Sequence, residues 1–416
     1  MNNQRPRRTI ESPNLSSILP HDLIVRILLR LPVRSLLRFK SVSKPWLFLI
    51  SDPQFGKSRY DLAAALTHRC LANHNDSEIE SIDIDAASLH NYESSVVNLK
   101  YPLSSPPHEN NPVDFLGSCR GFILVAYGRG NVIVWNPSTR VRRRIADNLE
   151  WMKFHFLNGF GYDTSTDDYL LVRIEVNLWE TYIYSQQDPD IITNHPTRIR
   201  LFSMKTNSWF YLEGAYAQYA DLGHCEFKVG SFLNEALHWF VTSVETSNHA
   251  IIAFDLVERS LSEIPLSQIL ARELECREYH LRVMGECLSL CCPGDQYDVA
   301  SMAEIWMMKK YKVQSSWTKL FVFSTCNIPH NMFFPICFTK HGEIFGSNGS
   351  RSLMIVNDKG KLLDECSFDW YRADLLHCGM YRESLLSLPN DFEEASGVLE
   401  EAREDDQLTS SLKETS

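Results

Sequence analysis

Three local groups of histidine, cysteine or arginine residues have types that could carry chemistry. The pairs His224-Cys225 and His377-Cys378 combine two zinc-binding residue types, but neither has the spacing of a known zinc site. A basic run, which predicts either a solvated strand edge or a surface for an acidic or phosphorylated target, consists of Arg140, Arg142, Arg143 and Arg144.

Sequence motifs that position catalytic groups are absent. There is no P-loop, H-E-x-x-H, G-x-S-x-G or dinucleotide fingerprint, and Gly128-Arg129-Gly130 lacks the third glycine of the last of these. We therefore expect no catalytic residue, no cofactor and no metal site.

Composition narrows the classes of partner. The net charge of −11 and the pI near 5.7 argue against nucleic-acid binding, which leaves a basic footprint. No apolar run approaches the ~18 residues that span a bilayer, so we expect no membrane partner. The eleven cysteines are odd in number and include no C-x-x-C, which favours reduced thiols. With a polar segment at 1–17 instead of a signal sequence, we expect a protein of the cytoplasm, the nucleus or both.

The composition and hydrophobic pattern of the sequence change along the chain. Residues 1–17 predict a flexible tail, 18–65 a helical module, and 79–388 a β domain of short apolar runs separated by Gly, Pro, Asn and Asp. Residues 391–416 are rich in Glu, Asp and Ser and predict a disordered acidic tail.

Three short helices are expected in the helical module. Pro20 begins the first, Pro32 ends it, and Ser43 can cap the third, which carries Trp46. About 33 residues have too little interior to bury all their apolar side chains, so help from a partner is expected. An apolar face rimmed by charge predicts a protein-binding surface.

Residues 19–46, LPHDLIVRILLRLPVRSLLRFKSVSKPW, resemble the F-box motif of plant F-box proteins nearly residue for residue, and Leu49-Ile50-Ser51-Asp52-Pro53-Gln54-Phe55 continues the resemblance. Ser41 and Pro45 depart from the family's usual cysteine and small polar residue. The resemblance implies docking on a Skp-type linker and, through it, on a cullin scaffold. Carried over by position, the linker contacts are Leu19, Pro20, Leu23, Ile27, Leu28, Leu31, Pro32, Leu36, Leu37, Val42 and Trp46, some of which must instead hold the helices together.

The β domain contains a repeat in which an apolar strand, a polar turn and a second apolar strand follow one another. Its equivalent positions are 67, 52, 52 and 50 residues apart, at Trp135, Phe202, Phe254, Trp306 and Val356. Hairpins are predicted ahead of several of them, at Cys119–Leu124, Leu233–Trp239 and Lys340–Phe345. A period near 50 residues is typical of kelch-like propeller blades, whose faces are buried by stacking around a ring.

We therefore predict a mainly β protein: a three-helix F-box followed by a β-propeller-like, kelch-like domain of about six blades, with a two-sheet sandwich as the alternative. Residues 79–100 would begin the ring, and Leu385, Leu386 and Leu388 could close it by pairing with the first blade. The order of Trp135-Asn136-Pro137, Gly159 to Asp163 and Leu237-His238-Trp239 resembles the F-box-associated domain of plant F-box proteins, from about residue 113 to 325. That resemblance implies a module that binds a target protein.

Long connections on one rim of the ring are the expected target-binding region. They are Trp179 to His195, Tyr216 to His224 and Cys292 to Ser301, and the first contains the candidate anchors Trp179, Tyr182 and Tyr184. The favoured function is a non-catalytic adaptor that brings a target protein to an SCF-type ubiquitin ligase for ubiquitination and degradation. The alternatives are a scaffold or competitor that binds the linker without delivering a substrate and, more remotely, a propeller enzyme.

Overall fold

The computed structural model describes residues 20–62, 68–75, 78–84, 96–100, 113–127, 131–145, 155–178, 197–214, 219–221, 227–273, 279–295, 297–298, 301–349, 352–367 and 379–389. The chain forms two compact units, and each is considered by itself. The first comprises residues 1–66 with 384–386, and the second comprises 67–383 with 387–416. The expected tails at 1–17 and 391–416 lie outside the described residues. Within the described residues, no helix has the length and apolarity needed to cross a membrane.

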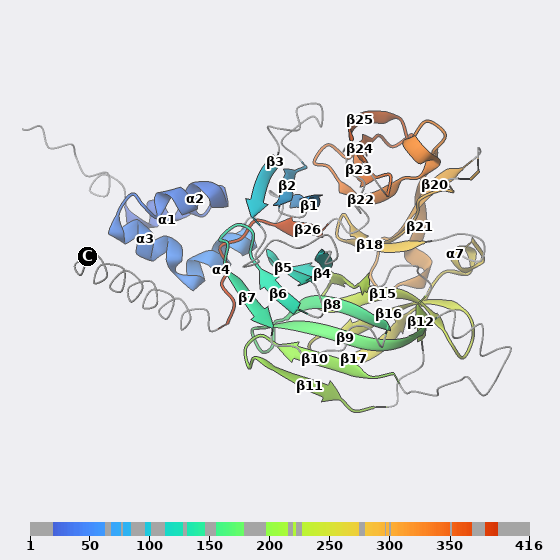
Figure 1. Cartoon of the computed structure of the whole chain (residues 1–416), viewed down its shortest axis with the longest axis horizontal. Coiled ribbons are helices and arrows are strands. Elements are labelled where there is room, and N and C mark those ends of the chain that lie inside the picture. The colour runs from blue at the N-terminus through green and yellow to red at the C-terminus, as the bar shows by residue number, and fades with distance from the viewer. Residues whose placement is uncertain are drawn as a thin grey trace, which may run out of the picture. The chain divides into compact units, whose positions relative to one another are not determined.

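The first unit is helical, and the three expected helices are confirmed (Figure 1). The Ser43 hydroxyl accepts a hydrogen bond from the Trp46 amide at 3.4 Å and so caps the third helix. A fourth helix follows at Pro53, after the Asp52 carboxylate accepts a hydrogen bond from the Gln54 amide at 2.8 Å. The helices are α1 (His21–Leu28), α2 (Val33–Phe39), α3 (Lys44–Ser51) and α4 (Pro53–Leu62).

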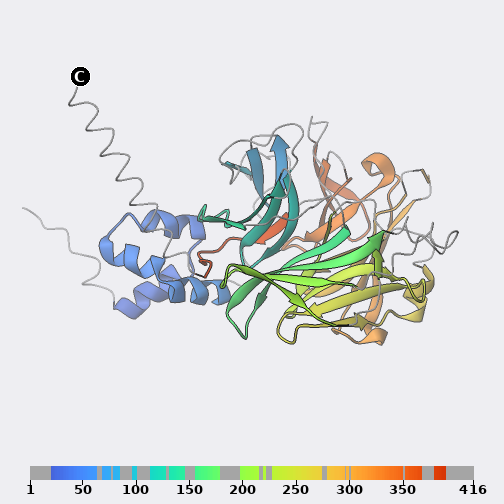
Figure 2. The same ribbon diagram turned by 60° about the horizontal axis from the view of Figure 1, so that its bottom comes forward.

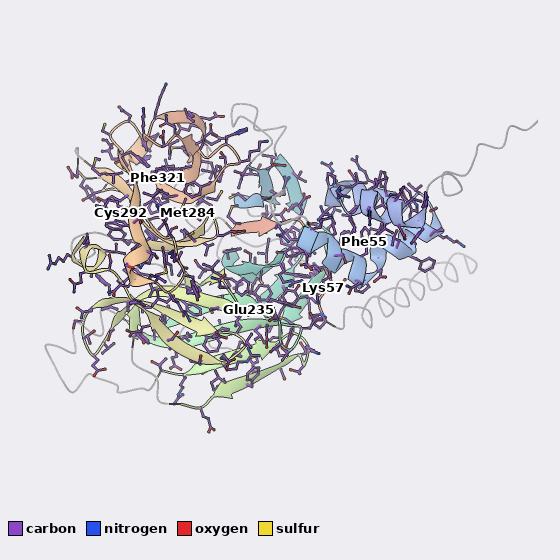
Figure 3. The ribbon with its side chains drawn as sticks, turned by 180° about the vertical axis from the view of Figure 1, so that it is seen from behind. Phe55, Lys57, Glu235, Met284, Cys292 and Phe321 are labelled. Carbon is purple, nitrogen blue, oxygen red and sulfur yellow. The ribbon has the colours of Figure 1, made fainter. Side chains whose placement is uncertain are left out.

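The core of the helical unit includes one residue from far along the chain. Leu385 is 9% exposed and packs with buried apolar residues of all four helices, namely Leu28, Val33, Leu36, Ile50 and Phe55 (Phe55 is labelled in Figure 3). A Cβ atom at Gly56 would lie 3.2 Å from the Leu385 carbonyl oxygen, so the absence of a side chain there permits the close approach. Arg59 is also buried and donates from Nε and Nη2 to the Leu31 carbonyl at 3.1 and 3.0 Å. This carbonyl follows the end of α1, and Arg59 supplies its hydrogen-bond donors.

The second unit is a six-bladed β-propeller, as predicted, and each blade contains four antiparallel strands (Figures 1 and 2). Blade 1 contains β26 (Gly379–Arg382), β1 (His68–Asn75), β2 (Glu78–Asp83) and β3 (Val96–Lys100). Blade 2 contains β4 (Val113–Cys119), β5 (Phe122–Tyr127), β6 (Asn131–Trp135) and β7 (Arg142–Ile145). Blade 3 contains β8 (His155–Asp163), β9 (Asp168–Leu178), β10 (Ile199–Ser203) and β11 (Ser208–Leu212).

The other three blades complete the ring. Blade 4 contains β14 (Ser231–Leu233), β15 (Ala236–Ser243), β16 (His249–Asp255) and β17 (Ser260–Ile264), and is followed by α7 (Gln268–Glu273). Blade 5 contains β18 (His280–Met284), β19 (Cys287–Cys292), β20 (Met302–Met308) and β21 (Trp317–Ser324), with the 3₁₀ helix η5 (Gln314–Ser316) before β21. Blade 6 contains β22 (Phe334–Phe338), β23 (Ile344–Ser347), β24 (Ser352–Val356) and β25 (Leu362–Ser367), preceded by the 3₁₀ helix η6 (Pro329–Asn331).

Blades 3 and 4 are joined into one ten-stranded sheet, which Figure 2 brings forward in green and yellow. The short strand β12 (Tyr219–Asp221) pairs with β9 on one side and with β15 on the other, while β13 (Phe227–Val229) lies parallel to β8. Backbone hydrogen bonds, in addition to side-chain packing, therefore hold these two blades together.

The expected repeat is confirmed. Each of its five marker positions, Trp135, Phe202, Phe254, Trp306 and Val356, lies on the third strand of its blade. The three expected hairpins connect first to second strands. In blades 2 and 4, the turn between third and fourth strands begins with Asn136 or Asp255, whose side chain accepts amide hydrogen bonds within the turn, and ends with Arg140 or Arg259 at positive φ.

Ring closure differs from the prediction. The closing strand is β26, Gly379–Arg382, which pairs with β1, whereas Leu385, Leu386 and Leu388 lie outside any strand. The β domain was expected from about residue 79, and its first described strand begins at His68. Residues 79–84 and 96–100 form the next two strands of the same blade.

A buried histidine links blade 4 to the connection that follows β20. His238 Nδ1 lies 3.0 Å from the Ser231 carbonyl oxygen, and Nε2 lies 2.8 Å from the Tyr311 hydroxyl. Burial of the ring lowers the pKa of His238 to about 4. The neutral imidazole is therefore the form that the folded ring accommodates.

We predict that Leu385→Asp unfolds the helical unit. The change removes an apolar side chain and puts a charge into the core, which should cost about 3 kcal/mol or more. Hydrogen exchange of the amides of α1 to α4 measures the effect directly. Ser387→Asp, two residues later at an exposed position, is the matched control. Unchanged protection of α1 to α4 in the Leu385 variant would show that the helices do not need this segment.

We also predict that His238 makes the propeller sensitive to acid. Its folded pKa lies below the unfolded value near 6.5, so stability is complete above that pH and is lost as pH falls toward 4. The loss should reach about 2 kcal/mol at pH 5, since each pH unit contributes about 1.4 kcal/mol. Urea unfolding at pH 7 and pH 5 tests this against His238→Gln, whose stability should fall less over the same interval. An equal fall in both proteins would contradict the prediction.

Candidate protein-binding site

The predicted linker contacts separate into two groups in the helical unit. Leu28 and Leu36 are 1% and 0% exposed and belong to the unit's own core. Leu23, Ile27 and Val42 are 44%, 51% and 61% exposed, which leaves them available to a partner. Pro20 and Pro32 are also exposed, Leu31, Leu37 and Trp46 are half-buried, and Leu19 lies outside the described residues.

Helix periodicity explains this division. Leu23 and Ile27 are four residues apart and therefore lie one above the other on α1, and Leu28 is rotated from them into the core. The half-buried Trp46 packs against Phe39 of α2, with ring centroids 5.3 Å apart in an edge-on arrangement. We call the exposed set Leu23, Ile27 and Val42 the apolar stripe.

Two further exposed apolar residues were missed by the sequence analysis. Leu47 and Phe48, on α3, are 42% and 74% exposed, whereas Ile50 of the same helix is buried. The signal was present in the sequence, since residues 46–50 are all apolar and a short helix that packs one face cannot bury five successive side chains.

The helical unit is basic in a chain that is acidic overall. Residues 20–62 contain eight Lys and Arg and three Asp and no Glu, a net charge of +5. Four arginines recur every fourth residue and are exposed: Arg26, Arg30, Arg34 and Arg38. Exposed apolar side chains and cations on the same unit fit a partner whose binding surface carries apolar and acidic side chains.

The candidate target anchors Trp179, Tyr182 and Tyr184 lie outside the described residues, as do parts of the other two candidate connections. The described strands on either side of these connections end at one face of the ring, because second-to-third and fourth-to-first connections of up-and-down blades leave the sheet on the same side. Of the second connection, the described residues 219–221 form β12, which pairs with β9 and β15 and is part of the sheet.

Tyr297, in the third of these connections, is a described aromatic residue at 87% exposure. On either side of it, the Asp295 amide donates to the Ser301 hydroxyl at 2.5 Å, and the Thr325 amide donates to the Ser301 carbonyl at 3.0 Å. Sequence analysis named this connection but did not single out Tyr297.

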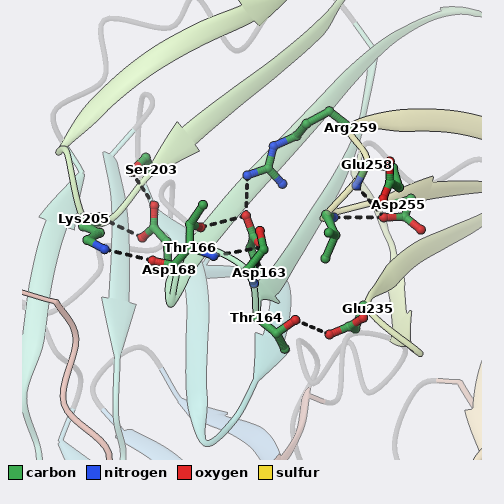
Figure 4. A network of polar contacts seen from close by, with 12 residues as sticks. Asp163, Thr164, Thr166, Asp168, Ser203, Lys205, Glu235, Asp255, Glu258 and Arg259 are labelled. Carbon is green, nitrogen blue, oxygen red and sulfur yellow. Dashed lines mark hydrogen bonds and ion pairs between the residues drawn. The ribbon is translucent and has the colours of Figure 1, made fainter.

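On the opposite face, the turns of blades 3 and 4 share a polar network (Figure 4). The Arg259 guanidinium donates to the Asp163 carboxylate at 2.5 Å, and Thr166 Oγ1 donates to the same carboxylate at 2.7 Å. Burial acts to raise the pKa of Asp163, but these hydrogen bonds and those from Ser165 outweigh it and lower the pKa to about 2. Thr164 donates to Glu235 across the same junction.

The polar atoms of this network hydrogen-bond to one another, so its role is to hold the turns of the two blades together. Asp168 accepts from the Ser203 hydroxyl at 2.5 Å and from the Lys205 amide at 2.8 Å, so its oxygens are also occupied by the fold. Among the described residues, no three His, Cys, Asp or Glu side chains gather as metal ligands would. Cys291 and Cys292, adjacent in sequence, belong to different apolar clusters.

Comparison with known proteins agrees with this architecture. Residues 16–58 match the F-box domain, and residues 71–381 match the F-box associated beta propeller domain. F-box protein CPR1 of Arabidopsis thaliana is 26% identical over 318 residues, which are 73% of this chain and 72% of that protein. An F-box/kelch-repeat protein of the same plant is 28% identical over 323 residues, or 73% and 78% of the two chains.

Among solved structures, TolB from Acinetobacter baumannii matches 79% of this chain and 72% of its own with a TM-score of 0.39 and 9% identity, which is too weak a likeness to support an inference. The two domain matches cover both units in the order that the structure shows, and the second covers more than half of the chain. The chain therefore belongs to the family of F-box proteins that carry an F-box-associated β-propeller domain.

Proposed function

We propose that this protein is a substrate-recognition adaptor of an SCF-type ubiquitin ligase in the cytoplasm or nucleus. The helical unit docks on a Skp-type linker, which connects it to a cullin scaffold, and the propeller captures a target protein. The observation that carries the proposal is the apolar stripe, which remains exposed on an F-box whose core is already filled by other residues.

The mechanism is proximity, and this chain supplies no chemistry to it. Holding a target next to the ligase raises the effective concentration of the target's lysines to about the millimolar range, provided that the geometry allows both contacts at once. The adaptor therefore needs two binding surfaces on one chain. The stripe supports the first, and the connections on one face of the ring support the second.

The second candidate is a scaffold or competitor that occupies the linker without delivering a substrate. The same apolar stripe favours it, because linker binding alone requires nothing from the propeller. Isolation of the complex from cells with the proteasome inhibited separates the two. An adaptor brings down linker, cullin and a ubiquitinated target, whereas a competitor brings down linker without cullin or ubiquitinated protein.

We predict that Ile27→Asp abolishes linker binding without unfolding the helical unit. Burial of one such side chain contributes about 1.5–3 kcal/mol, and a buried carboxylate costs more. The linker's Kd should therefore rise by about 100-fold or more, since 1.4 kcal/mol is tenfold. Calorimetric titration of the full chain with the linker measures it. Val313→Asp, which changes a 40% exposed valine of the propeller, should bind as the native chain does. Undiminished binding by a folded Ile27→Asp protein would refute the assignment.

The target site is tested by replacing Trp179, Tyr182 and Tyr184 together with Ala. We expect the variant to retain linker binding and its melting temperature while it loses the co-purified target, because exposed aromatic residues commonly anchor interfaces. Tyr297→Ala, on the same face, tests whether the third connection contributes. If the triple variant is stable and still captures the target, the target binds elsewhere. If it unfolds, the three rings are core residues.

A further inference from the structure

The outer strand of blade 2 carries a cluster of unpaired cations. β7 hydrogen-bonds with β6 and with no other strand of the described residues, so it is an edge strand. Arg140, Arg142 and Arg144, which we call the arginine edge, are exposed. Arg144 donates to the Asn131 side-chain oxygen at 2.6 Å, and no carboxylate of the described residues forms an ion pair with any of the three.

The last described residue of the chain, Pro389, contacts this strand. Arg143, between the exposed arginines, is 8% exposed and donates to the Met204 carbonyl at 2.9 Å. Its other terminal nitrogen donates to the carbonyl of Pro389, the last described residue. Pro389 therefore lies beside β7, on the side of the strand opposite to Arg142 and Arg144.

The segment that follows is strongly acidic. Residues 390–416 contain nine Asp and Glu and two Lys and Arg, so their net charge is −7. Asp391 is two residues beyond Pro389, within about 7 Å of it for an extended chain. Most of the other acids are in two groups, Glu393-Glu394 and Glu400 to Asp406, which the chain can bring back over β7.

We propose that the acidic segment 391–416 binds the arginine edge of its own propeller. Charge complementarity and the tether at Pro389 both favour this occupant over a separate molecule, because a tethered partner is present at an effective concentration of about millimolar. Occupation neutralises the cations and covers an open strand edge, which proteins otherwise protect from pairing with other chains. An acidic target that needed this edge would first have to displace the segment.

Carbodiimide coupling of the full chain tests the proposal. Arg142→Lys keeps the positive charge and provides an amine that can form an amide bond with a nearby carboxylate. We expect mass spectrometry to find position 142 coupled to acids of 391–416 at low salt. The yield should fall at least about fivefold in 1 M salt, where the screening length is about 3 Å. Arg272→Lys, an exposed position on α7, is the matched control and should not couple to the segment.

Coupling of the segment to Lys40, Lys44 or Lys57 of the basic helical unit in place of position 142 would overturn the proposal. Equal coupling at positions 142 and 272 would do the same, because it would show non-specific encounter. A third contrary outcome is that position 142 does not couple to the segment while Arg140→Glu with Arg144→Glu abolishes target capture. The edge would then be a site for an acidic target.

Discussion

A four-stranded blade has two apolar faces, and both must be packed against another sheet to be removed from water. This requirement determines the architecture of the propeller. In β20, Ala303, Ile305 and Met307 pack against blade 6, while the alternate residues Trp306 and Met308 pack against blade 4. No single sheet can cover both sides of such a strand. Only a closed ring of blades gives each face a neighbour, so stability depends on closure as a whole.

Closure brings together residues separated by about 300 positions. β26 supplies the remaining strand of blade 1, where the Tyr381 hydroxyl lies 2.7 Å from the Ser81 hydroxyl and the Arg69 guanidinium lies 3.8 Å from the carboxylate of Glu383. Three residues after Arg382, the chain supplies Leu385 to the helical core. The same short stretch thus completes two cores in succession, and the F-box of this protein is not made from its N-terminal residues alone.

Local pattern accounts for what the sequence could predict. Strand period, turn residues and the repeat of about 50 residues located the third strands and the hairpins, because blades repeat and each local signal was reinforced by the others. Local pattern did not indicate which distant segment each residue packs against. Leu385, Leu386 and Leu388 have the composition of a strand, yet the first packs among helices. β1, with the sequence HRCLANHN, lacks apolar alternation and was not predicted as a strand.

The candidate site shows the same limit. Leu23, Ile27, Leu28 and Leu31 are apolar residues at helical spacing, but only packing against α2 to α4 decides which of them face the core. Phe48 could not be predicted in the same way, because helical periodicity indicates which positions are buried and Phe48 is exposed. The aromatic residues at 179–184 lie outside the described residues, so their assignment to a target stays a prediction.

Apolar faces alone restrict the packing of neighbouring blades only loosely, since Leu, Ile and Val can cover one another in many combinations. Directional contacts at the junctions restrict that choice. The Arg120 guanidinium lies 4.0 Å from the ring centroid of Tyr162, Arg143 reaches the Met204 carbonyl, and Arg259 reaches the buried Asp163. Each joins a residue of one blade to a specific acceptor or ring on the next, and a different neighbour would leave a buried charge without its partner. At the two junctions of blade 3, with blades 2 and 4, directional polar contacts therefore add to the apolar packing and favour one arrangement of the neighbouring faces.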